Sequence, residues 1–140
     1  MEKRKIFSLF LVILSLFCFL SCGGKGEVAC ALAEKTETRV VITVSEGANG
    51  GTVLDCMKLL QGQGEISYQI SGGMVTEING KANAADFSGC WMLYTSDKEM
   101  SNAEWGTVEY NGETIASAIL GAEALKVTKG EMYIWEYVIF

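Results

Sequence analysis

Seven aromatic side chains offer the clearest means of binding in this sequence. They are Trp91, Tyr94, Trp105, Tyr110, Tyr133, Trp135 and Tyr137. Aromatic rings give a flat or apolar partner a large contact area at a small cost in side-chain entropy. Packing within a sheet accounts for most of them. Trp105 differs because it lies in a polar stretch, 97–106, without strand periodicity, so we expect it to be exposed in a loop and to take part in binding.

The composition argues against catalysis, metal binding and nucleic-acid binding. The sequence contains no histidine, which excludes Ser-His-Asp and Cys-His catalytic arrangements and imidazole metal sites. Carboxylates such as Glu99 and Glu104 belong to no calcium-binding motif and fit a solvated surface. The chain has 17 acidic and 11 basic residues, so it lacks the positive charge that phosphate binding requires. We therefore expect a binding protein rather than an enzyme.

The first residues have the pattern of an export signal. A basic run, 3–5, precedes an apolar run, 6–20. A helix over 6–20 reaches only about 22 Å, which is short of the roughly 30 Å hydrocarbon core of a membrane. The sequence therefore predicts export rather than a permanent transmembrane helix.

The end of the apolar run resembles a bacterial lipoprotein processing site, with Ser21 before Cys22 and two glycines after it. The resemblance implies a signal peptide over 1–21 and a lipid on Cys22, the new N-terminus. Phe19 and Leu20 depart from the usual pattern of such sites, and Cys18 fits the pattern less well.

Cleavage before Cys22 removes one acidic and three basic residues, which changes the formal charge from −6 to −8. Anionic lipid headgroups repel a domain of that charge. We expect an extracytoplasmic protein that is lipid-anchored to the bacterial cell membrane and stands away from its surface.

Three cysteines remain in the mature chain beyond Cys22, namely Cys30, Cys56 and Cys90. An odd number leaves at least one thiol unpaired within the chain. Cys56 and Cys90 are either buried thiols or a disulfide formed in an oxidising compartment, and the sequence leaves both alternatives open. No CxxC motif joins them, so we expect neither a thiol redox enzyme nor a zinc site.

Residues 22–37 are rich in Gly, Ala, Glu and Lys and predict a flexible spacer, and we expect one folded domain over 38–140. A helix is expected over 52–61, where Thr52 and Asp55 have the spacing of a capping box. We expect Val53, Met57 and Leu60 to form the buried face of this helix. Gly62 is expected to end it.

Strands are expected on both sides of this helix, at 39–44, 65–70, 74–78, 90–95, 107–110 and 131–138. In the last of them, Met132, Ile134 and Val138 share one face, and we expect that face to be the core. The rings of Tyr133, Trp135 and Tyr137 are then partly exposed or covered by the neighbouring loop. The order of elements predicts an α+β domain.

Five short segments carry a resemblance to a known family. They are GTVLD at 51–55, ING at 78–80, WMLY at 91–94, GAEAL at 121–125 and GE at 130–131 leading to Trp135. In this order and spacing they resemble the transcobalamin-like C-terminal domain family, found alone on many bacterial surface lipoproteins. The resemblance covers about 38–140 and implies a small β-grasp-like domain with one helix packed on a mixed or antiparallel sheet.

In the animal vitamin carriers this module forms the smaller half of a cobalamin clamp, so the resemblance implies a corrinoid or another planar small molecule as ligand. It places the strand of Trp91 and Tyr94 beside the ligand, and these residues with Trp105 make the expected binding site. The chain has no counterpart of the larger half-clamp, which a second protein would supply, and it resembles the family with an insertion at 98–110.

The alternative hypothesis is a protein or glycan interaction module of the cell surface without a small-molecule pocket. The sequence names neither the ligand nor the partner nor the oligomeric state.

Overall fold

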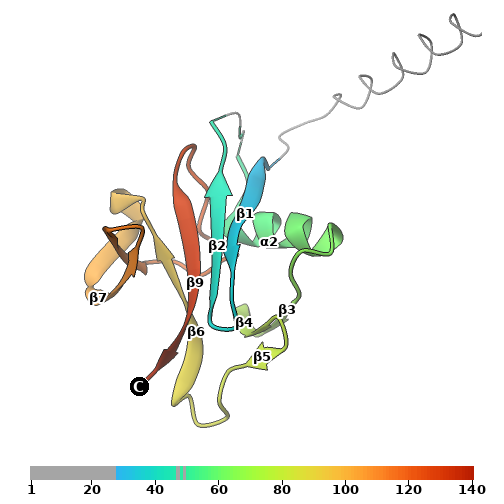
Figure 1. Cartoon of the computed structure of the whole chain (residues 1–140), viewed down its shortest axis with the longest axis vertical. Helices are drawn as coiled ribbons and strands as arrows, with labels where there is room; N and C mark the ends of the chain where they lie inside the picture. The colour runs from blue at the N-terminus through green and yellow to red at the C-terminus, as the bar shows by residue number, and fades with distance from the viewer. Residues whose placement is uncertain (1–27, 47, 49) are drawn as a thin grey trace, which may run out of the picture.

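The computed structural model describes residues 28–46, 48 and 50–140 (Figure 1). The predicted signal peptide, 1–21, and the predicted lipidation residue Cys22 lie outside this range. No helix within the described residues is long and apolar enough to cross a membrane.

The main element is a six-stranded sheet in which every neighbouring pair of strands is antiparallel. Its order is β1 (Cys30–Lys35), β2 (Arg39–Val44), β9 (Met132–Ile139), β6 (Gly89–Thr95), β8 (Glu113–Ala118) and β7 (Ser101–Tyr110). The central strands β2, β9 and β6 are rich in β-branched and aromatic residues, which favour a sheet buried on both faces. β1 and β7 form its two edges.

One helix, α2 (Val53–Gly62), packs beside β1 (Figure 1). Thr52 caps it as expected: the Asp55 backbone N–H donates to Thr52 Oγ1 at 3.3 Å, and the Thr52 backbone N–H donates to Asp55 Oδ2 at 2.9 Å. Val53, Met57 and Leu60 are fully buried, which confirms the predicted stripe. The helix includes Gly62, and the chain turns at Gly64, whose positive φ suits glycine.

A smaller antiparallel sheet follows the helix. It consists of β3 (Tyr68–Ser71), β4 (Met74–Ile78) and β5 (Lys81–Ala82). Gly72 and Gly73 have positive φ and make the tight turn between β3 and β4, as their sequence predicts. Among the described residues the fold is thus mostly antiparallel sheet with one substantial helix, which confirms the broad α+β prediction.

The two faces of the large sheet have separate cores. The inner face, turned toward α2, holds the larger cluster, in which Trp91, Leu93 and Trp135 meet the helix side chains. The outer face holds a smaller cluster of Val41, Tyr94, Ile115 and Ile134. The sheet curls around this smaller cluster, because β7 brings the ring of Tyr110 to 6.0 Å from the guanidinium of Arg39 on β2.

Two sequence expectations are wrong here for the same reason. The segment 30–35, expected in the spacer, is strand β1, with Cys30 opposite Val44 and Leu32 opposite Ile42. The face of β9 expected to be partly exposed or covered by a loop instead belongs to the core that includes α2: Tyr133 and Trp135 are 0% and 5% exposed. Both outcomes depend on pairing with distant strands, which local periodicity does not report.

Candidate functional site

All three tryptophans of the chain line one cavity of about 470 Å³. We call this cavity the tryptophan groove, and its lining residues are Gly73, Met74, Val75, Trp91, Met92, Leu93, Trp105, Ser117, Ala118, Ile119, Leu120, Gly121, Ala122 and Trp135. It lies between the inner face of the large sheet, strand β4 and the segment 119–122. No lining residue is charged. The groove therefore suits an uncharged, largely apolar partner.

Trp91 forms a fixed wall of the groove. Its indole Nε1 donates to the Lys81 carbonyl oxygen at 2.7 Å, and its backbone N–H donates to Asn83 Oδ1 at 2.9 Å. Its ring meets the Tyr137 ring edge to face, with centroids 5.5 Å apart. These contacts hold the residue in one position, so Trp91 needs no rearrangement before a ligand packs against it.

Trp105 is the exposed wall, and the local structure explains why. In β7, Asn102 pairs with Ser117 and Thr107 pairs with Ala116, so residues 103–106 have no partners on β8 and bulge out. The bulge ends at Gly106, whose φ of 127° is a glycine conformation. The side chain of Trp105 is 60% exposed. Exposure of Trp105 was expected, but the predicted loop is wrong, because 101–110 is an edge strand with a bulge.

Trp135 is the residue that the sequence analysis missed as a site residue. It pairs directly with Leu93 across β9 and β6, which puts both on the inner face. Its Nε1 is buried and has no hydrogen-bond partner among the described residues. A buried donor left without an acceptor costs about 1–3 kcal/mol, so such groups are rare in folded proteins. A ligand that offers an acceptor would satisfy it only if the structure opened to expose this atom.

Tyr94 does not belong to the groove, contrary to expectation. Its side chain is 4% exposed and lies in the outer cluster with Ile115 and Ile134. Burial raises the pKa of its phenol, with smaller effects from Glu136 and Cys90. The physical reason is its spacing, since an odd separation from Trp91 along a strand places the two rings on opposite faces.

The same alternation separates the two cysteines that the sequence left as a candidate pair. Cys56 is fully buried in α2 on the inner face. Cys90 precedes Trp91 and lies on the outer face, where its thiol donates to Met92 Sδ at 3.8 Å. A sheet lies between them, so a disulfide between Cys56 and Cys90 does not fit this fold.

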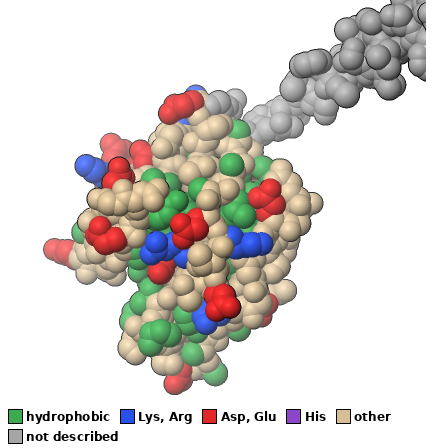
Figure 2. Space-filling model, in the orientation of Figure 1, with side chains coloured by type: hydrophobic (Ala, Val, Ile, Leu, Met, Phe, Trp, Pro, Cys, Tyr) green, Lys and Arg blue, Asp and Glu red, His purple; other side chains and the backbone are tan. Residues whose placement is uncertain are grey.

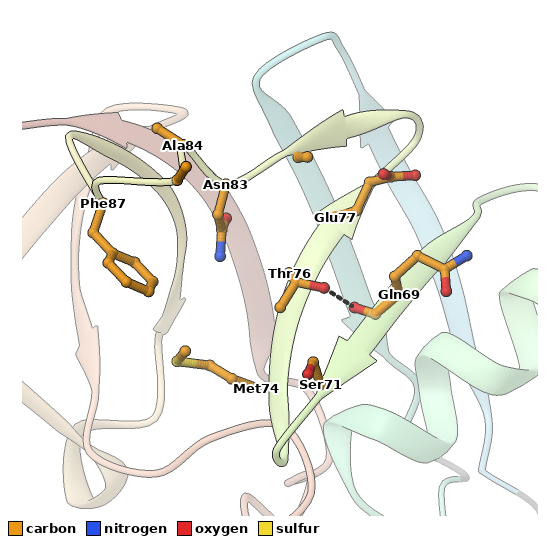
Figure 3. A pocket seen from close by; sticks show the side chains of 10 residues that line it. Gln69, Ser71, Met74, Thr76, Glu77, Asn83, Ala84 and Phe87 are labelled. Carbon is orange, nitrogen blue, oxygen red and sulfur yellow. Dashed lines mark hydrogen bonds between the residues drawn. The ribbon is translucent and has the colours of Figure 1, made fainter.

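A second cavity of about 440 Å³ lies over β3, β4 and β5 and is lined by Met74 and Phe87 among others (Figure 3). Phe87 has a φ of 59°, unusual for a large side chain, and is 60% exposed. Two of its polar side chains are already used: Thr76 Oγ1 donates to the Gln69 carbonyl at 3.4 Å, and Asn83 Nδ2 donates to the Val75 carbonyl at 3.2 Å. This cavity lacks the three indole rings that line the tryptophan groove.

Charge gives no sign of another site on the face that Figure 2 shows. Acidic, basic and hydrophobic side chains are mixed over the face seen in Figure 2, with no continuous basic patch. No group of three or more potential metal ligands occurs among the described residues. The arrangement around the groove is suited to binding by ring contact.

Comparison with known proteins found no match to this chain among protein-family models, curated proteins or solved structures.

Proposed function

We propose that this chain is an extracytoplasmic, lipid-anchored binding module whose tryptophan groove takes up a flat, largely apolar small molecule, with a corrinoid as the first candidate. The observation that carries the proposal is the convergence of Trp91, Trp105 and Trp135 on one uncharged cavity. A single exposed ring is common on protein surfaces, but three indoles brought together from three strands are what stacking on a planar ligand requires.

The size and the fold support the same proposal. Cavities that bind small molecules usually measure about 300–1,000 Å³, and the groove falls within that range at about 470 Å³. An antiparallel sheet with one helix is compatible with a β-grasp-like domain of the transcobalamin-like family. In such an arrangement the groove holds one face or edge of the ligand, and a second protein covers the rest.

The unpartnered Nε1 of Trp135 is buried, so it can meet a ligand only if the groove opens further as the ligand binds, and this would narrow the ligand chemistry. A molecule with a carbonyl or amide oxygen at its rim can accept this hydrogen bond, whereas a pure hydrocarbon cannot. Corrinoids carry amide groups around a planar ring and meet both requirements. Binding then relieves an unsatisfied donor in the free protein, which favours the complex.

The test titrates the purified full-length protein with cobalamin and related corrinoids and follows tryptophan fluorescence. Corrinoids absorb light at the wavelengths of indole emission, so a corrinoid bound anywhere on the protein quenches the tryptophan fluorescence. The affinity is therefore the quantity that distinguishes the variants. We expect saturable quenching at micromolar ligand, and W105A is expected to weaken the affinity by about tenfold. Free tryptophan amide at the same absorbance corrects for light lost to the ligand.

The matched control is F87A. Phe87 and Trp105 are both 60% exposed, but only Trp105 lines the groove. F87A should therefore leave the affinity unchanged. Equal affinity of wild type and W105A would contradict the assignment of the groove, and the absence of saturable binding by any corrinoid would contradict the corrinoid ligand.

A second candidate function is a protein or glycan interaction module, and three exposed apolar side chains favour it. Met74, Trp105 and Phe87 are each more than half exposed, and Met74 lines both cavities. Exposed apolar groups near one another mark surfaces that meet a partner. If corrinoids fail to bind and W105A and F87A both abolish attachment to cells, this function replaces the first.

A further inference from the structure

The first strand of the domain and its helix bring two cysteines together on the inner face. Cys30 lies opposite Val44, a member of the inner cluster, so its side chain points toward α2. Two residues earlier on the same side, Val28 packs so closely against Gly51 that a Cβ there would collide with it. The first described residues therefore lie against the N-terminal end of α2. Cys56 is fully buried in the same helix.

Cys30 packs against the inner cluster that contains Cys56, and β1 is the strand that α2 contacts, so the two thiols lie close enough to interact. Hydrogen bonding by Cys56 lowers the pKa of the Cys30 thiol, against the opposing effect of burial. The same bond, followed by burial, raises the pKa of the Cys56 thiol. Cys30 is half-buried and lines a cavity of about 240 Å³ at the edge of the sheet, so a reagent can reach it from solvent. Cys30 thus has the properties of an attacking thiol and Cys56 those of a resolving one.

We propose that Cys30 and Cys56 form a disulfide that fastens β1 to α2 and leaves Cys90 as a free thiol. The oxidant is a low-molecular-weight or protein disulfide of the extracytoplasmic space. The thiolate of Cys30 attacks it and releases one thiolate, which gives a mixed disulfide on Cys30. Cys56 then loses its proton and attacks the Cys30 sulfur, which releases the second thiolate. The two protein thiols are oxidised and one external disulfide is reduced to two thiols.

The position of the bond gives it a mechanical role. β1 is an edge strand and pairs only with β2. It is also the strand nearest to the predicted lipid anchor at Cys22, so any pull on the anchor reaches the domain through β1. A covalent link to α2 transfers that pull to the core instead of the edge hydrogen bonds.

The experiment incubates the reduced, purified full-length protein with oxidised glutathione and then alkylates all remaining thiols in denaturant. Trypsin places Cys30, Cys56 and Cys90 in three different peptides, 26–35, 40–58 and 82–98. We expect a linked pair of the first two peptides and an alkylated third. Full alkylation of both Cys30 and Cys56, or linkage of either one to Cys90, would overturn the proposal. This result does not depend on whether a corrinoid binds or where the protein is located.

Thermal unfolding gives an independent readout. Oxidation should raise the Tm of the wild type by about 10 °C, because the bond restricts the unfolded chain. C30S and C56S should show no such response to oxidised glutathione, while C90S should respond like the wild type. A Tm of the wild type that is equal in the two redox states would overturn the mechanical role even where the bond forms.

Discussion

The two faces of the six-stranded sheet are built from the same strands but differ in how completely they are closed. On the outer face, the curl of β7 covers the cluster around Tyr94 and Ile134, and Arg39 Nε contacts Glu136 Oε2 at 2.6 Å at its margin. On the inner face, α2 covers the strands from β1 to β9, but between β6, β4 and β7 the tryptophan groove stays open. The outer face is therefore closed by the protein's own side chains.

This difference shows that the role of an aromatic residue here depends on the face of the sheet on which it lies, rather than on its residue type. Tyr94 and Trp91 lie on one strand, yet Tyr94 is enclosed in a small core and Trp91 is the wall of a cavity. The inner face also holds the buried donor of Trp135, which a closed core would not tolerate readily. Substitutions on the two faces should separate folding from binding.

The largest effect is expected where the helix closes the inner face. M57A removes a fully buried side chain of α2 and should lower the free energy of unfolding by about 2–5 kcal/mol, measured by urea denaturation. L59A lies on the same helix but is 37% exposed, and it should cost less than about 1 kcal/mol. Similar losses for both variants would show that the helix is oriented differently.

Binding should be sensitive to one face only. W105A is expected to weaken corrinoid affinity by about tenfold, which equals about 1.4 kcal/mol. Y94F removes only a hydroxyl on the outer face and should leave the affinity unchanged, as measured by the same fluorescence titration. An affinity loss for Y94F as large as that for W105A would break the distinction between the faces.

Within the inner face, two indole N–H groups should differ. W91F deletes the donor to the Lys81 carbonyl and should cost about 1 kcal/mol more in stability than W135F, whose donor has no partner to lose. Chemical denaturation of the two variants measures this. W135F should nevertheless weaken the binding of a ligand that carries an acceptor. A larger stability loss in W135F than in W91F would indicate a partner for Trp135.

The smallest effect concerns the cysteines of the two faces under reducing conditions. Hydrogen bonding by Cys56 lowers the pKa of Cys30, whereas burial raises the pKa of Cys90 on the outer face. Because the thiolate is the reactive form, iodoacetamide should label Cys30 at a lower pH than Cys90. C56A should move the labelling of Cys30 to higher pH, and C56S, which keeps a donor, should move it less. Identical pH profiles for Cys30 in all three proteins would contradict the thiol hydrogen bond.

The parts of the fold with local signals could be predicted. The capping box of Thr52 and Asp55, the stripe of Met57 and Leu60 and the turn at Gly72 depend on residues close in sequence. β1 could not be predicted, because its Ala, Glu and Lys residues have little strand preference and acquire their conformation by pairing with β2. The long β7 was hidden by its bulge, which interrupts the alternation on which strand prediction depends.

The candidate site was predictable to a similar extent. Trp91 and Trp105 were expected and do line one groove. Tyr94 does not line the groove, because its odd spacing from Trp91 places it on the other face. Trp135 was missed because its strand has apolar residues on both faces, and alternation then gives no sign of which face meets the helix. Its unpartnered N–H is a property of the packed structure alone.

The irregular pairing of the two edge strands has a consequence for the association of one copy of this domain with another. β1 changes register between Leu32 and Glu34, and β7 does so between Asn102 and Thr107. A regular edge strand is a template onto which another chain can add a strand, and bulges remove that template. Neither edge offers a long uninterrupted row of backbone donors and acceptors. Copies of this domain at high concentration should therefore remain separate rather than join into a continuous intermolecular sheet.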